Sequence, residues 1–161
     1  MRKTRRRIAD LLVLCAIAGV VAYAVLERQG RAPVASVRAD PVRTPGALNP
    51  DVMQASIGET ICVRGWTATV RPPTSYTSEL KRQQMVEYGE TGPPSAYQED
   101  HLISLELGGA PADPRNLWPE PYPRASTVDQ IENALNDKVC SGQLSLADAQ
   151  RQEAALKHSY G

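Results

Sequence analysis

The stretch that decides the fold is residues 97–122, YQEDHLISLELGGAPADPRNLWPEPY. Asp100 and His101 stand at the head of an apolar run that ends at a pair of glycines. A loop of small and turn-forming residues follows the glycines, and it allows two strands to turn back on each other. The chain has two histidines, and the second, His158, lies close to the C-terminus. Any histidine chemistry is therefore expected at His101.

Helices are expected on both sides of this stretch. Upstream, Ser75 or Thr77 can cap a helix that runs through Leu80 and Met85 and ends before Gly89. Downstream, a helix starting near residue 126 has apolar residues at the spacing of a core-facing stripe, namely Val128, Ile131, Leu135 and Val139. Residues 144–156 predict a last helix, with the final few residues frayed. Nearer the start of the domain, residues 60–63 and 66–70 predict short β-segments interrupted at Arg64-Gly65.

The central stretch carries the residue types of a hydrolytic metal site. Asp100, His101 and Asn116 supply an anionic oxygen ligand, a base and a neutral oxygen ligand. This is a poor set for zinc, which prefers Cys and His ligands in structural sites. It suits a hard cation such as Mg²⁺, which keeps several waters. Such an ion polarises a phosphodiester while a neutral histidine deprotonates the attacking water.

These residues resemble the HNH endonuclease motif of the ββα-metal nucleases. The motif has the order D-H, hydrophobic residues, G-G, a short loop, N-L and a following helix. The likeness is greatest to small bacterial HNH-like proteins that carry a DHLISLELGG…DPRNLWPEP signature, and it spans about residues 97–140. The resemblance implies an α+β fold with a ββα-metal core, flanked by helices and preceded by the short β-segment.

The resemblance also implies roles for individual residues. His101 would be the general base, Asp100 a metal ligand, and Asn116 either a metal ligand or the residue that fixes the loop. One divalent ion is expected, Mg²⁺ first, with Mn²⁺ or Zn²⁺ as alternatives. HNH nucleases usually place a His or Asn on the following helix, and here the substitutes are Asp129, Glu132 and Asn133, which share one helical face.

The expected function is metal-dependent hydrolysis of DNA or RNA with little sequence specificity. Arg115 and Arg124 are the candidate contacts to the phosphate backbone, within a scattered set that also includes Arg64, Arg71, Lys81 and Arg82. From Gly46 onward, however, nine Lys and Arg face fifteen Asp and Glu, a net charge of −6. That charge opposes nucleic-acid binding. The alternative is therefore a non-catalytic, membrane-anchored binding module that retains an HNH-like fold.

The N-terminal third predicts a membrane anchor. Residues 1–7 are strongly basic, and residues 8–26 are apolar apart from Asp10. A helix of that length spans about 28 Å, which matches a bilayer core. The basic end should remain cytoplasmic, so a linker over 27–45 would lead to a domain at 46–161 in the periplasm or at the cell surface. If Ala22-Tyr23-Ala24 is a cleavage site, the protein is secreted instead.

Two cysteines fall within the domain, Cys62 and Cys140. An even pair outside the cytoplasm predicts a disulfide, which would tie the early segment to the end of the helix after the central stretch. Metal binding is the weaker interpretation, because neither cysteine has a CxxC or histidine partner.

Overall fold

The structure is a computed structural model that describes residues 38–159. The described part is an α+β fold in which two antiparallel strands pack among helices. Its regular elements are α2 (Trp66–Val70), α3 (Thr74–Glu87), β1 (Tyr97–His101), β2 (Leu117–Pro121), α4 (Arg124–Cys140) and α5 (Leu146–Ser159). Short 3-10 turns lie at Gln54–Glu59, Pro94–Ala96, Leu105–Leu107 and Pro114–Asn116.

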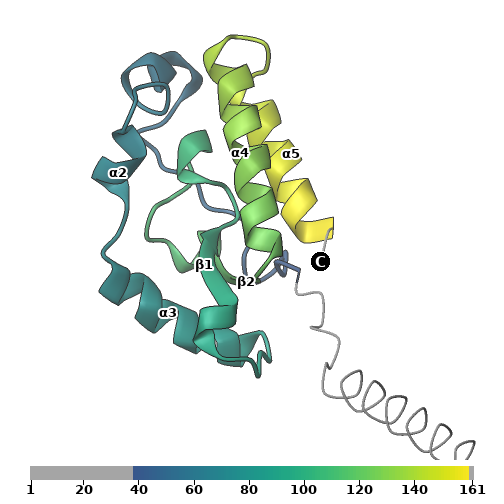
Figure 1. The fold of residues 1–161 in the computed structure, drawn as a ribbon. Coiled ribbons are helices and arrows are strands. Elements are labelled where there is room, and N and C mark those ends of the chain that lie inside the picture. Colours follow the sequence, from purple (N-terminus) through teal and green to yellow (C-terminus); the bar gives the residue numbers. More distant parts are fainter. Residues whose placement is uncertain (1–37, 160–161) are drawn as a thin grey trace, which may run out of the picture. The chain divides into compact units, whose positions relative to one another are not determined.

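The two strands form the centre of the domain. Their register pairs Tyr97 with Pro121 and His101 with Leu117. Helix α3 contacts the hairpin from one side, and α4 and α5 lie side by side across from it (Figure 1). Because successive side chains of a strand point to opposite faces, β1 sends alternate residues toward α3 and toward the α4–α5 pair.

Local signals place the helices where the sequence expects them. Helix α3 follows Pro73 and ends before Gly89, whose positive φ of 73° stops the helix. Ser145 caps α5, since its hydroxyl accepts a hydrogen bond from the Asp148 backbone N–H at 3.1 Å. Helix α4 runs to Cys140. The three helices after residue 74 are therefore as predicted in type and approximate extent.

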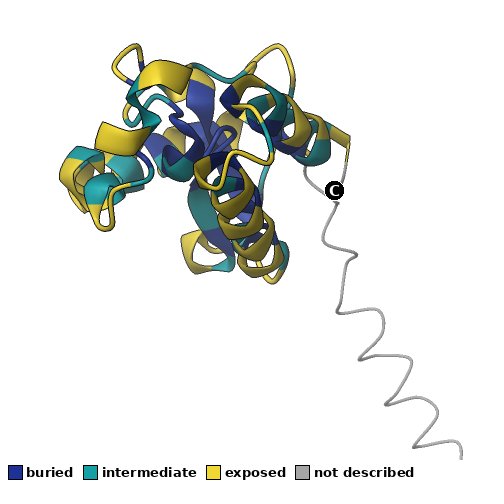
Figure 2. Cartoon of the chain, turned by 90° about the horizontal axis from the view of Figure 1, so that it is seen from above, coloured by how far each residue is buried: buried dark blue, intermediate teal, exposed yellow. Residues whose placement is uncertain are grey.

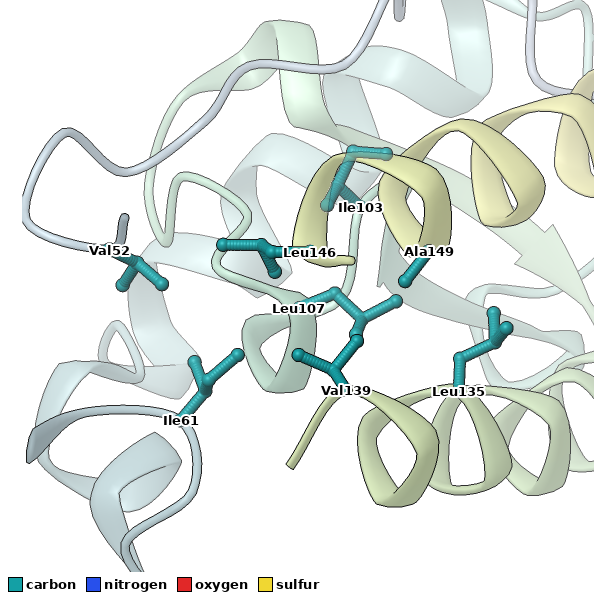
Figure 3. Close-up of a cluster of buried hydrophobic side chains, with 8 residues drawn as sticks. All are labelled: Val52, Ile61, Ile103, Leu107, Leu135, Val139, Leu146 and Ala149. Carbon is teal, nitrogen blue, oxygen red and sulfur yellow. The ribbon is translucent and has the colours of Figure 1, made fainter. Parts of the chain in front are cut away.

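The core lies where α4, α5 and the loop after β1 meet (Figure 3). It is a cluster of aliphatic side chains: Val52, Ile61, Ile103, Leu107, Leu135, Val139, Leu146 and Ala149. A smaller cluster joins Leu102 and Trp118 to Ala39. Figure 2 shows the buried residues gathered in the middle of the domain, with the outer helix faces exposed. One expected core residue, Ile131, is instead 37% exposed, because α4 turns Glu132 inward.

The expected disulfide is confirmed. Cys62 and Cys140 are bonded, with their Cα atoms 5.5 Å apart and a sequence separation of 78. The bond joins the turn before α2 to the last residue of α4. It closes most of the domain, including the hairpin, into one covalent loop.

The early β-segment was a wrong prediction. Residues 66–70 form α2, and residues 60–63 form turns. A strand needs a partner for its backbone, and in the described part of the chain β1 and β2 pair only with each other. The early backbone is satisfied locally instead, as when Trp66 N–H donates to the Val63 carbonyl at 3.0 Å. Trp66 then packs against the main core from a helix.

The predicted apolar run after His101 does not continue the strand either. Strand β1 ends at His101, and the next residues form a buried loop containing the turn at Leu105–Leu107. Domain packing also begins before Gly46. Ala39 is buried, its N–H donates to the Lys157 carbonyl at 3.2 Å, and Thr44 is fully buried.

The predicted anchor over residues 8–26 lies outside the described residues, as do the basic segment 1–7 and most of the linker. Across residues 38–159, none of the helices has both the length and the apolar character that crossing a bilayer demands.

Candidate functional site

Asp100 lies on β1, and its side chain is close to residues of α4 and α5. Its residue exposure is 5%, and its Oδ2 accepts a hydrogen bond from Lys157 Nζ at 2.8 Å. Glu132 of α4 accepts from the same ammonium at 2.6 Å. Two carboxylates from separate elements therefore meet at one buried lysine on the last helix.

Lys157 also holds a third carboxylate. Glu153, one turn earlier on α5, lies 3.3 Å from Nζ and is fully buried. Both of its oxygens lie 3.0 Å from the Ser104 backbone N–H, which donates to them. The Lys157 ammonium further donates to the His101 carbonyl. The C-terminal helix is thus joined to the end of β1 through a buried ionic network.

Asp129 completes a second grouping on the same side of the hairpin. One oxygen from each of Asp100, Asp129 and Glu132 lies within 4.8 Å of the others. Gln98 Nε2 bridges two of them weakly, 3.3 Å from Asp100 Oδ1 and 3.5 Å from Asp129 Oδ1. The structure therefore brings together three of the residues named from the sequence. Asn133 stays outside, exposed, with its amide donating to the Asp129 carbonyl at 2.7 Å.

Acids outnumber cations in this network. Glu120 of β2 is fully buried and lies 3.1 Å from Arg124 Nε, which adds one more carboxylate and one more cation. Burial, followed by the nearby Asp100 charge, raises the pKa of Glu120 to about 9. Burial also raises the pKa of Glu132 well above its usual value. Without a further cation, Glu120 holds its proton near neutral pH.

Asp100 is the ionised member of the network. Burial alone would raise its pKa, but the Lys157 ammonium, together with Glu120 and His101, lowers that pKa below the usual value. Burial alone would likewise lower the pKa of Lys157, yet Asp100, Glu153 and Glu132 raise it well above its ordinary value. A charged Lys157–Asp100 pair therefore lies at the centre of the group.

His101 ends β1 and has its own partner. Its Nε2 lies 2.9 Å from the Pro111 carbonyl oxygen. Because a carbonyl only accepts, Nε2 carries the proton and Nδ1 has the free lone pair. Burial lowers the pKa of His101 below its usual 6.5, against the opposing effect of the Pro111 bond. Among residues 38–159, no side chain or backbone group hydrogen-bonds Nδ1.

Charges on other elements influence His101 and the neighbouring Glu106. Apart from burial, the pKa of Glu106 is lowered by Arg71 and raised by Asp129 and Asp137. Arg71 also contributes to lowering the pKa of His101. The Arg71 charge therefore acts on both His101 and Glu106. Direct hydrogen bonds between His101 and those acids are absent from the described contacts.

Asn116 closes the loop that follows β1. Its Oδ1 accepts from the Ile103 N–H and its Nδ2 donates to the Ile103 carbonyl, both at 2.9 Å. Nδ2 also donates to the Ala110 carbonyl at 3.1 Å. The fully buried amide acts as an extra peptide group that extends the pairing beyond the strands. It fixes the loop, and its side-chain hydrogen bonds go to backbone groups of Ile103 and Ala110.

Gly109 makes these hydrogen bonds of Asn116 to Ile103 and Ala110, the Asn116 latch, possible. A Cβ at Gly109 would lie 1.7 Å from the Ile103 carbonyl oxygen and 2.7 Å from Asn116 Nδ2. No other residue type fits in that space. The second glycine of the pair therefore permits the close approach that holds Pro111 opposite His101.

We expect Asn116→Ala to lower the free energy of unfolding by about 3 kcal/mol, because three buried backbone groups lose their partner. Urea denaturation measures the change. Asn133→Ala is the matched control, since that amide is exposed and bonds only within its own helix. A loss for Asn116→Ala no larger than that of the control would contradict the role assigned to the latch.

The two arginines named from the sequence have other partners. Arg115 is exposed and pairs with Asp113 at 2.6 Å, beside the loop. Arg124 turns inward to Glu120 and its side chain is 18% exposed. Arg71, which is exposed, has an electrostatic effect on His101 and lowers its pKa.

The acidic group fits a hard divalent cation in its donors. Lys157 holds one oxygen of Asp100 and one of Glu132, so each keeps a second oxygen, and Asp129 is not bonded to Lys157. Carboxylate oxygens are the ligands that Mg²⁺ and Mn²⁺ prefer. A divalent ion would also compensate the ionised form of Glu132, which burial disfavours. Zinc fits less well, because the group contains no sulfur or imidazole ligand.

Comparison with protein-family models, with curated proteins and with solved structures finds no match for the chain. The interpretation of the site therefore depends on its own geometry.

Sequence reasoning missed Lys157. Lys157 lies just after the predicted helix 144–156, among the final residues that were expected to fray, and yet it is fully buried. One signal was available: Glu153 and Lys157 are spaced i, i+4 on a segment otherwise rich in alanine. That spacing is common on solvated faces, so it does not by itself indicate burial.

Proposed function

We propose that this domain hydrolyses phosphodiester bonds of nucleic acids with a divalent metal ion, and that His101 is the general base. The observation that carries the proposal is the 2.9 Å bond from His101 Nε2 to the Pro111 carbonyl. It orients the ring, fixes the proton on Nε2 and leaves Nδ1 as the basic nitrogen. A histidine that is neutral near pH 7 and hydrogen-bonded on one side only suits proton abstraction.

The steps assigned to the chain are few. His101 Nδ1 takes a proton from the attacking water, and the resulting imidazolium is stabilised by the Pro111 carbonyl and by the Asp100 charge. Asp100, Asp129 and Glu132 would hold the ion, since one oxygen from each lies within 4.8 Å of the others. When bound, a divalent ion polarises the phosphate and stabilises the departing oxygen. Asn116 keeps the Pro111 carbonyl in place.

Arg71 is the cation best placed to meet a phosphate. It is exposed, follows α2 and acts on both His101 and Glu106. The domain is acidic and offers few further cations to contact the phosphate backbone of a nucleic acid. This supports weak, sequence-independent binding. The disulfide supports a location outside the cytoplasm, as the sequence of residues 1–26 also predicts.

A second candidate function has its own observation. Lys157 neutralises part of the acidic group without any metal, as expected of a non-catalytic binding module that keeps only the architecture. The two candidates differ in turnover. A module of this kind would leave DNA and RNA intact in every metal buffer.

A pair of α4 variants tests the proposed metal ligands. We expect Asp129→Asn to slow cleavage of plasmid DNA at least about 10-fold at limiting Mn²⁺, because the ion loses a charged ligand. Asp137→Asn is the control, since it lies farther along the same helix and outside the grouping. Initial nicking rates measure both. Equal rates for the two variants would rule out Asp129 as a ligand.

A further inference from the structure

We infer that Lys157 is a resident cation of the acidic group, and that it sets how weakly the group binds a divalent metal ion. The inference rests on the proposed metal site, but it concerns a residue that neither the sequence pattern nor the HNH resemblance assigns. It predicts that removing the lysine charge strengthens metal binding.

The first step is the saturation of the ammonium. Lys157 Nζ contacts Asp100 Oδ2 at 2.8 Å, Glu132 Oε1 at 2.6 Å and Glu153 Oε1 at 3.3 Å. It also donates to the His101 carbonyl. An ammonium has three N–H donors, and Asp100, Glu132 and the His101 carbonyl use all three, while Glu153 adds an ion pair. The side chain is 0% exposed, which leaves no competing water contact.

The second step is that Lys157 cannot move aside easily. Its backbone carbonyl accepts from the Ala39 N–H at 3.2 Å, so the end of α5 is fastened to the segment before the domain core. Glu153, one turn earlier, is in turn held by the Ser104 N–H. An incoming ion must therefore bind beside the ammonium.

The third step is electrostatic. An ion held by Asp100, Asp129 and Glu132 would share two of those carboxylates with Lys157. Repulsion between a divalent ion and a neighbouring ammonium is strong in a buried setting. Asp129 contacts Gln98 and has no ion pair with Lys157, whereas Glu153 pairs with Lys157 and Glu120 pairs with Arg124. The net effect is a site with lower metal affinity than three carboxylates alone would give.

The test measures Mn²⁺ binding by the full-length chain, using equilibrium titration and the thermal midpoint with and without Mn²⁺. We expect Lys157→Met to bind Mn²⁺ on the order of tenfold more tightly than the wild type. Its midpoint should fall without metal and rise further than that of the wild type when Mn²⁺ is added. Lys138→Met, on the exposed face of α4, should behave as the wild type.

Glu153→Gln provides a second variant if Lys157→Met does not fold, and it should change the affinity for Mn²⁺ in the opposite direction. It leaves the lysine charge less compensated and removes no proposed ligand, so Mn²⁺ binding should weaken. Lys157→Met binding no tighter than the wild type would overturn the inference while leaving the proposed function standing. If that variant does not fold, unchanged or tighter binding by Glu153→Gln overturns it in the same way.

Binding by Lys157→Met alone, with none by the wild type, would support the resident cation and count against metal-dependent hydrolysis by the native chain. Absence of binding in both would overturn both proposals.

Discussion

His101→Ala is expected to reduce the rate of phosphodiester cleavage by about 10²- to 10⁴-fold, the usual contribution of a general base. The structure gives the reason: Nδ1 is the basic nitrogen, since Nε2 donates to Pro111. Steady-state cleavage of a fluorescent oligonucleotide at saturating Mn²⁺ measures the effect. Because alanine leaves the Asn116 latch intact, the variant should remain folded.

His158→Ala is the matched control for that variant. His158 is the other histidine, and its Nε2 bonds the Thr44 carbonyl at 3.0 Å, away from the acidic group. Its removal should leave the cleavage rate unchanged. Equal cleavage by wild type and His101→Ala would exclude His101 as the base.

The pH dependence of the wild type has a defined sign. Burial lowers the pKa of His101 below 6.5, and the neutral form is the active base. Activity should therefore persist as the pH falls to 6.5 and decline only below it. A decline centred above pH 6.5 would contradict a buried neutral base.

Removal of the disulfide is expected to lower the free energy of unfolding by about 4 kcal/mol, the chain-entropy value for so long a loop. The bond between Cys62 and Cys140 spans 78 residues and joins the turn before α2 to the end of α4. The double variant Cys62→Ser, Cys140→Ser measures the loss by urea denaturation. Below the unfolding transition, its hairpin and acidic network should retain the native arrangement.

The wild type in reducing buffer is the comparison for that double variant. Both should unfold at similar urea concentrations, because both lack the covalent loop. Cys15→Ser, outside the domain, should leave the midpoint unchanged. A double variant within 1 kcal/mol of the oxidised wild type would show that the loop constraint contributes little.

The helices that the sequence predicts correctly carry strong local signals. Apolar residues recur at helical spacing in α4, Ser145 caps α5, and Gly89 ends α3. The segment 66–70 has no local signal of this strength. Its β-type side chains would have favoured a strand had a partner strand been available, and the tertiary structure offers none in the described part.

In the candidate site, too, some residues and contacts could be predicted from the sequence and others could not. Asp100, Asp129 and Glu132 are brought together because a hairpin followed by a helix puts adjacent elements in contact, which the motif order already implies. Asn116 could be named from the sequence, but its role depends on the path of the loop. Its amide bonds Ile103, an interaction that requires Gly109 to lie against the backbone.

Lys157 could not have been placed from the sequence. Its burial depends on how α5 lies against β1 and on compensation by Asp100 of β1, Glu132 of α4 and Glu153 of its own helix. Burying a charged lysine is costly unless it is paired and hydrogen-bonded, so its position follows from the assembled network. Long-range packing of this kind leaves little trace in local periodicity.

The central claim is tested most directly by the rate at which the purified wild-type chain nicks supercoiled plasmid in Mn²⁺, with and without chelator. The account predicts steady accumulation of nicked circles in Mn²⁺ and none in chelator. Intact plasmid in every metal buffer, or nicking that chelator does not stop, would contradict it.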